Sequence, residues 1–115
     1  MVEIKKLPAA FYCTAAGHEP VREWLKGLDE ADRRTVGQDI ATAEFGWPVG
    51  MPVCRSLSKG LYEIRSDISH RRVTRVIFCV TEKQMVLLHG FIKKTQKTLK
   101  ADLALALKRK KELTT

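Results

Sequence analysis

Three strand-like segments follow one another in the second half of the chain. In Leu61 to Ile68, charged side chains occupy every second position from Glu63 to Asp67, and the positions between them are uncharged. Val73 to Val80 is rich in β-branched residues, and Met85 to Ile92 is nearly all apolar. Each of these patterns favours a β-strand. The links 69–72 and 81–84 are short and polar, so they predict antiparallel hairpins.

Two arginines lie inside the first two of these segments, at Arg65 and Arg75. An arginine within an apolar strand is costly unless it is paired or reaches a wet surface. One interpretation is that each arginine pairs with a carboxylate such as Glu63 or Asp67. The other is that one face of the sheet is a polar floor that binds an anion. The lysines directly after the third segment favour the anion; they are Lys93, Lys94 and Lys97.

The segments GLYEIR (60–65), TRVIF (74–78) and VLLHGFIKKTQKT (86–98) resemble the RelE/ParE toxin superfamily. They are most similar to its phage-derived, HigB-like branch of type II toxin–antitoxin toxins. FYCTAAGHEPVREWLKGL (11–28) is also similar to that branch, so the resemblance covers nearly the whole chain. It implies an α+β, small RelE-like fold with an antiparallel-rich curved sheet of about four to five strands. An N-terminal helical hairpin would cover one face, and a basic helix would follow the sheet.

The remaining elements are predicted from periodicity and turn signals. Pro20 suits the first turn of a helix, and an apolar stripe follows it at Val21, Trp24, Leu25 and Leu28. We expect Trp24 to anchor the core. The other expected elements are a first strand within 2–12, a second helix at about 30–45 capped by Asp29, a short strand at 53–57 and a last helix at about 99–113.

The length of 115 residues predicts one domain, residues 1–115. No apolar run approaches the roughly 20 residues that span a membrane, and no signal-peptide core is present, so we expect a cytoplasmic protein without a membrane partner. The three cysteines, Cys13, Cys54 and Cys79, are widely spaced and form no CxxC pair. They indicate neither a zinc site nor a disulfide framework, and we expect no metal and no cofactor.

The net charge of +8 is concentrated near the end of the chain, where residues 93–111 hold eight basic residues and one acid, Asp102. Such a region is typical of proteins that bind nucleic acid or an acidic protein. Lysines also complement the dipole at the carboxyl end of a helix, which is the interpretation favoured for residues 108–111. A functional role is favoured for the lysines that follow the third strand.

The resemblance implies a metal-independent mRNA endoribonuclease that acts on the ribosome and inhibits translation. Arg65 matches the arginine of the family's LYEIR strand and would hold the scissile phosphate, with Arg75 in support. Lys93 or Lys94 would be the base, the acid or a phosphate clamp, because a lysine becomes a base when burial or other cations lower its pKa. His89 would either line this site or satisfy the core.

Lys59 and Lys97 are expected to bind the RNA backbone or ribosomal RNA. Some superfamily members carry a carboxy-terminal tyrosine, but the last aromatic residue here is Phe91. A residue that stacks on a base would then be Tyr62 or Trp47, or would be absent.

Two other functions fit the same residues. The superfamily includes ParE-type toxins, which inhibit DNA gyrase without cutting RNA. A basic nucleic-acid-binding module would show affinity that collapses with salt and would release no cleaved product. The partner that the resemblance implies is a cognate helix-turn-helix antitoxin in a hetero-oligomer, with mRNA on the ribosome as the substrate.

Overall fold

The computed structural model describes residues 5–48, 50, 53–93 and 100–113. Along these residues the elements are β1 (Ala9–Phe11), α1 (Pro20–Lys26), α2 (Glu30–Gly46), β2 (Cys54–Ser56), β3 (Leu61–Ile68), β4 (Arg72–Val80), β5 (Met85–Lys93) and α3 (Lys100–Glu112). The three long strands are confirmed, with β4 beginning one residue earlier and β5 ending one residue later than predicted. The expected helices and the short strand before β3 are confirmed as well. Residues 2–4 of the expected first strand lie outside the described residues.

The strands form one mixed sheet in the order β1-β5-β4-β3-β2. The pairs β2–β3, β3–β4 and β4–β5 are antiparallel, as their short links require, whereas β1 is parallel to β5. The open edge of β1 is short, and the buried Glu44 carboxylate accepts the Ala9 N–H at 2.7 Å. A short and partly blocked edge strand resists pairing with another chain.

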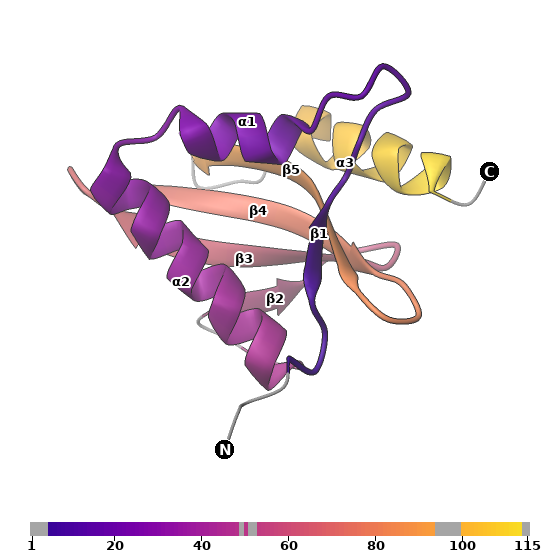
Figure 1. Cartoon of the computed structure of the whole chain (residues 1–115), viewed down its shortest axis with the longest axis horizontal. Helices are drawn as coiled ribbons and strands as arrows, with labels where there is room; N and C mark the ends of the chain where they lie inside the picture. Colours follow the sequence, from indigo (N-terminus) through magenta and orange to yellow (C-terminus); the bar gives the residue numbers. More distant parts are fainter. Residues whose placement is uncertain (1–4, 49, 51–52, 94–99, 114–115) are drawn as a thin grey trace.

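The helices α1 and α2 cover one face of the sheet, hereafter the α1/α2 face (Figure 1). They pack mainly on different strands, α1 on β5 and α2 on β3. Trp24 belongs to this core and lies against Gly90, which confirms it as a core residue. The buried apolar residues of this face include Val21, Val36, Ile40, Ile64, Val76, Phe78, Met85 and Leu87.

The opposite face, hereafter the α3 face, is covered in part by α3 (Figure 1). Ala106 of α3 is fully buried, and Leu103 and Leu107 pack beside it. The sheet contributes Leu61, Ile77, Cys79, Val86 and Leu88. Among the described helices, none combines the length and the apolar character that a membrane crossing requires. These layers confirm the α+β class and the small RelE-like architecture.

A β-bulge in β5 decides which side chains reach the α3 face. Ile77 pairs with His89 while the next residue of β4, Phe78, pairs with Leu87, so Leu88 has no direct partner. Both Leu88 and His89 therefore face α3, although strict alternation would place them on opposite faces. Phe91 and Lys93 follow His89 on the same side.

Candidate functional site

Arg65 of β3 and Arg75 of β4 lie directly opposite each other in the sheet and share the α3 face. Alternation along β3 puts Glu63 on this face too, and β2 adds Arg55 as the direct partner of Glu63. Like charges at opposed positions destabilise a sheet unless a counter-charge lies between them. We call this region the arginine face; it comprises Arg55, Glu63, Arg65, Asp67, Arg75, Phe91 and Lys93.

Glu63 is the counter-charge, and only 2% of its side chain is exposed. Its Oε1 accepts a hydrogen bond from Arg75 Nη1 and forms an ion pair with Arg55 Nη2 at 2.9 Å. Arg75 is also buried, whereas Arg55 reaches solvent. Within the described part of the chain, Glu63 Oε2 and Arg75 Nε are buried without a hydrogen-bond partner. One carboxylate thus holds two guanidinium groups in place.

Arg65 is held much more loosely than Arg75. Its side chain is 46% exposed, and its contact is a long ion pair of 3.4 Å with the open carboxylate of Asp67. An exposed pair of this kind contributes little and exchanges readily with another anion. Both arginines therefore pair with the carboxylates named from the sequence, but Arg65 keeps a guanidinium that a ligand can reach. A hollow beside it is lined by Asp39, Val53, Arg65 and Asp67.

Lys93 ends β5 on the same face, opposite Val73. Burial lowers the pKa of Lys93 below its ordinary value, and the guanidinium of Arg75 lowers it further. Glu63 opposes this shift, while Arg55 and Arg65 add to it. The physical cause is that a partly desolvated ammonium group lies among other cations. Lys94 and Lys97 lie outside the described residues.

His89 lies at the border between the arginine face and α3. Its Nε2 is 2.6 Å from Oδ1 of Asp102, and both side chains are largely buried. The imidazole stacks on Phe91 with 5.2 Å between ring centroids. Phe91 is the direct strand partner of Arg75. Arg65, Arg75 and Phe91 therefore lie side by side on the adjacent strands β3, β4 and β5, and His89 lies next to Phe91.

Two residues expected at the site are placed elsewhere. Tyr62 lies on the α1/α2 face, where its ring stacks on Phe78 and meets Trp47 edge-on. The alternation that predicts β3 already separates Tyr62 from Arg65, because neighbouring residues of a strand face opposite sides. Lys59 lies in the turn before β3, next to α3. Its carbonyl accepts a 2.8 Å hydrogen bond from Lys110 of α3. Neither side chain joins the arginine face.

Arg55 and Phe91 belong to the arginine face, and Asp102 borders it through His89; none of the three is predicted from the sequence as a site residue. Arg55 lies in a strand of three residues, whose pairing partner cannot be read from its own sequence. Phe91 carries a usable signal, since it follows His89 by two residues and therefore shares its face. Asp102 carries one too, as the single acid in the basic segment 93–111.

The arginine face carries four cations, Arg55, Arg65, Arg75 and Lys93, against the carboxylates Glu63 and Asp67. Its excess of positive charge and its exposed guanidinium suit an anion, and guanidinium groups match phosphate oxygens well. Among the described residues, no group of three or more His, Cys, Asp and Glu side chains is arranged to hold a metal ion. The fold and the site define a small α+β protein with a positively charged sheet face.

The sequence was compared with known protein families. Residues 23–111 match the family of phage-derived Gp49-like proteins (DUF891), which is most of the chain. The chain therefore belongs to this family. No curated protein matches it. The matched segment contains α2, the four antiparallel strands and nearly all of α3, and so includes every residue of the arginine face.

Proposed function

We propose that this protein is the toxin of a type II toxin–antitoxin system, a RelE/HigB-like endoribonuclease that cleaves mRNA on the ribosome. The observation that carries the proposal is the arginine face, on which an exposed arginine, a buried arginine and a lysine with a lowered pKa lie together. These groups supply the roles that RNA cleavage needs. The family's phage origin supports the same context.

In the proposed reaction the ribose 2′-oxygen attacks the adjacent phosphorus and loses its proton to a base. The bond from phosphorus to the 5′-oxygen breaks, and that oxygen takes a proton from an acid, leaving a 2′,3′-cyclic phosphate. Arg65 binds the scissile phosphate because its guanidinium is open to ligand. Arg75 is held by Glu63 directly opposite Arg65 and supports it with a preorganised guanidinium group; preorganised groups stabilise a transition state without reorganisation.

Lys93 is the first candidate for the base, because its lowered pKa raises the fraction of neutral amine near pH 7. Lys94 stays a candidate from the sequence. His89 is a further candidate for proton transfer, since the Asp102 carboxylate orients its ring. Phe91 takes the base-stacking role that the sequence suggested for Tyr62, because its half-buried ring borders both His89 and Arg75.

The proposed partners are mRNA on the ribosome and a cognate helix-turn-helix antitoxin. Part of the basic end of α3 already has internal contacts. Arg109 donates to the Leu88 carbonyl at 2.7 Å, and Lys110 donates to the carbonyl of Lys59. These two cations help to hold α3 on the sheet, so the arginine face is the better surface for RNA.

The test is induced expression in a growing bacterium, with mRNA ends mapped by primer extension. We expect the wild type to arrest growth and produce new cuts in translated messages. Arg65→Ala should fold normally and reduce cleavage about 100-fold or more, as the loss of one transition-state donor does. Arg34→Ala removes an exposed arginine of α2 and should cleave like the wild type.

Each outcome of this experiment has a distinct meaning. Cleavage by Arg65→Ala at the wild-type rate would contradict the assignment of the phosphate site. Growth arrest without cuts would contradict the ribonuclease and favour a ParE-like gyrase inhibitor, which a supercoiling assay with titrated gyrase then tests. No arrest and no cuts would favour a nucleic-acid-binding module without catalysis.

A further inference from the structure

The turn between β3 and β4 has an unusual backbone for its residues. His70 and Arg71 have φ angles of 59° and 58°, and the Arg72 N–H donates to the Ser69 carbonyl at 3.3 Å. Two consecutive positive φ angles are typical of a type I′ hairpin turn, where Asn-Gly is strongly preferred because side chains strain this conformation. The chain instead places an imidazole and a guanidinium at the two central positions.

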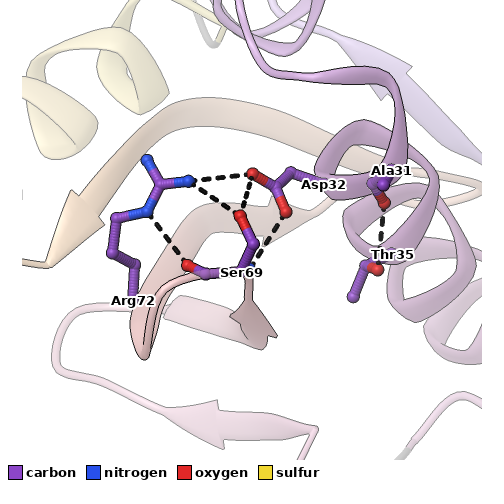
Figure 2. A network of polar contacts seen from close by, with 5 residues as sticks. All are labelled: Ala31, Asp32, Thr35, Ser69 and Arg72. Carbon is purple, nitrogen blue, oxygen red and sulfur yellow. Dashed lines mark hydrogen bonds and ion pairs between the residues drawn. The ribbon is translucent and has the colours of Figure 1, made fainter.

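A buried carboxylate holds this strained turn in place (Figure 2). Asp32 of α2 accepts hydrogen bonds from the Ser69 N–H at 3.0 Å, the Ser69 hydroxyl at 2.9 Å and Arg72 Nη2 at 2.9 Å. Arg72 Nε also donates to the Ser69 carbonyl at 3.1 Å. The residues that flank the turn are thus fixed to α2. Strained residues persist when their surroundings over-determine them, and they cluster at functional sites.

The two central side chains are left for solvent. His70 and Arg71 are exposed, and the interaction given for His70 is a charge interaction with Asp32. Arg71 lies in the turn, one residue before β4 begins and four residues before Arg75. Lys93 pairs with Val73, between these two positions. Basic residues are therefore present both on the arginine face and at the tip of the neighbouring hairpin.

We propose that the His70–Arg71 turn is a rigid phosphate contact for RNA, which extends the arginine face beyond the scissile phosphate. The choice of RNA as the ligand rests on the proposed function. The RNA that supplies this phosphate is either the mRNA in the site or ribosomal RNA around it. A fixed turn backbone lowers the conformational entropy that is lost when its side chains bind a ligand, which explains why the chain keeps a strained turn in place of a relaxed one.

The experiment measures separately how the His70–Arg71 turn affects the stability of the protein and how it affects RNA binding. The double variant His70→Asn with Arg71→Gly installs the preferred type I′ sequence and removes the exposed charge. Arg71→Gln removes the charge but keeps a side chain at positive φ. Lys83→Gln is the matched control, because Lys83 is an exposed cation in the hairpin loop at the other end of β4.

Thermal unfolding is measured together with binding to two probes, a short single-stranded RNA made uncleavable by 2′-O-methyl groups and purified bacterial ribosomes. We expect the double variant to unfold at a higher temperature than the wild type and yet bind less tightly. For the short RNA, a plot of the logarithm of the binding constant against the logarithm of the salt concentration has a negative slope. The magnitude of this slope should decrease by about 0.7 for each lost phosphate contact. Arg71→Gln should lose affinity without gaining stability, and Lys83→Gln should match the wild type.

A loss of affinity for the short RNA would assign the contact to mRNA, and a loss for ribosomes alone would assign it to ribosomal RNA. The proposal is overturned if the double variant gains stability and binds both probes like the wild type, if it loses stability, or if the wild type binds neither probe. Binding that depends on Arg71 in a protein that cuts no mRNA would leave this contact standing and refute the ribonuclease.

Discussion

At the scale of single residues, the arginine face is organised by one buried carboxylate. Glu63 compensates Arg75 inside the sheet and also reaches Arg55, so Arg65, the fourth member of this group, is left with only an exposed partner. Breaking a buried ion pair by removing one partner is costly, whereas an exposed pair contributes little. Arg65 is consequently the arginine that can be replaced without unfolding the protein.

Lys93 offers a direct test of the electrostatics of this site. Its pKa should lie below the ordinary 10.5, because burial and Arg75 both disfavour its charged form. Arg55→Gln removes one of the cations that lower this pKa, so the pKa of Lys93 should rise part of the way back. The measurement is an NMR titration of the Lys93 side-chain carbon next to the amine, in the wild type and in Arg55→Gln.

The control for this titration is Lys83→Gln. Lys83 lies in the β4–β5 turn, at the opposite end of β5 from Lys93, so this change should leave the pKa of Lys93 unaltered. A Lys93 pKa at or above the ordinary value in the wild type would remove the main support for its role as a base. An unchanged curve in Arg55→Gln would show that Arg55 does not contribute to the lowered pKa of Lys93.

At the scale of elements, the packing of α1 on β5 depends on a residue without a side chain. A Cβ atom built on Gly90 would lie 2.5 Å from Cε3 of Trp24, and two more atoms of the indole lie within 3.0 Å. The indole is rigid and packed in the core, so it cannot move away easily. Gly90 therefore allows α1 to approach the sheet directly behind the arginine face.

Gly90→Ala should lower the free energy of unfolding by about 1–3 kcal/mol through this overpacking, as measured by urea denaturation. Adding Trp24→Leu to Gly90→Ala should cost less than the sum of the two single changes, because the shorter side chain removes the clash. Gly37→Ala in α2 is the opposite case. Nothing lies within 4 Å of its added Cβ, so it should raise stability by about 0.5–1 kcal/mol. Additive effects at Gly90 and Trp24 would contradict this account of the contact.

At the scale of the whole molecule, buried acids on α2 connect the helical layer to the sheet. Asp32 holds the β3–β4 hairpin, and Glu44 holds Ala9 of β1 and pairs with Lys5 at 3.1 Å. Asp32 accepts its hydrogen bonds in its charged form. The joining of the two layers should therefore depend on pH.

The acid stability of the protein tests this dependence at Asp32. Hydrogen bonds from the Ser69 backbone and hydroxyl, with the charge of Arg72, hold the pKa of Asp32 below its ordinary 3.8, although burial opposes the shift. A carboxylate with a lowered folded-state pKa stabilises the fold above its unfolded pKa, and this contribution is lost as the pH falls through the folded pKa. Asp32→Asn should therefore unfold at a lower temperature than the wild type at pH 7, and the gap should narrow below about pH 4.

Thermal unfolding followed by circular dichroism at several pH values gives this comparison. Glu82→Gln removes an exposed carboxylate from the β4–β5 turn and should track the wild type at every pH. A gap between Asp32→Asn and the wild type that stays constant down to pH 2 would mean that the charge of Asp32 does not contribute.

The helices and strands, and the positions of the cations along them, follow from local sequence patterns. Alternation and β-branched residues are local properties, so β3, β4 and β5 could be predicted nearly to the residue, and Pro20 marked the start of α1. The same alternation placed Arg65 and Arg75 on strands whose short link makes them neighbours. It also carried the information that Tyr62 faces away from both.

The contacts between these groups depend on long-range packing. Parallel pairing brings β1 beside β5, and the three residues of β2 bring Arg55 to Glu63; both pairings join segments whose own sequences carry no record of the partner. The bulge at Leu88 turns His89 towards Asp102, which strict alternation does not predict. Burial lowers the pKa of Lys93, and burial is a property of the packed molecule. Local sequence patterns therefore predict which side chains are available for the site, and long-range strand pairing determines how those side chains are arranged.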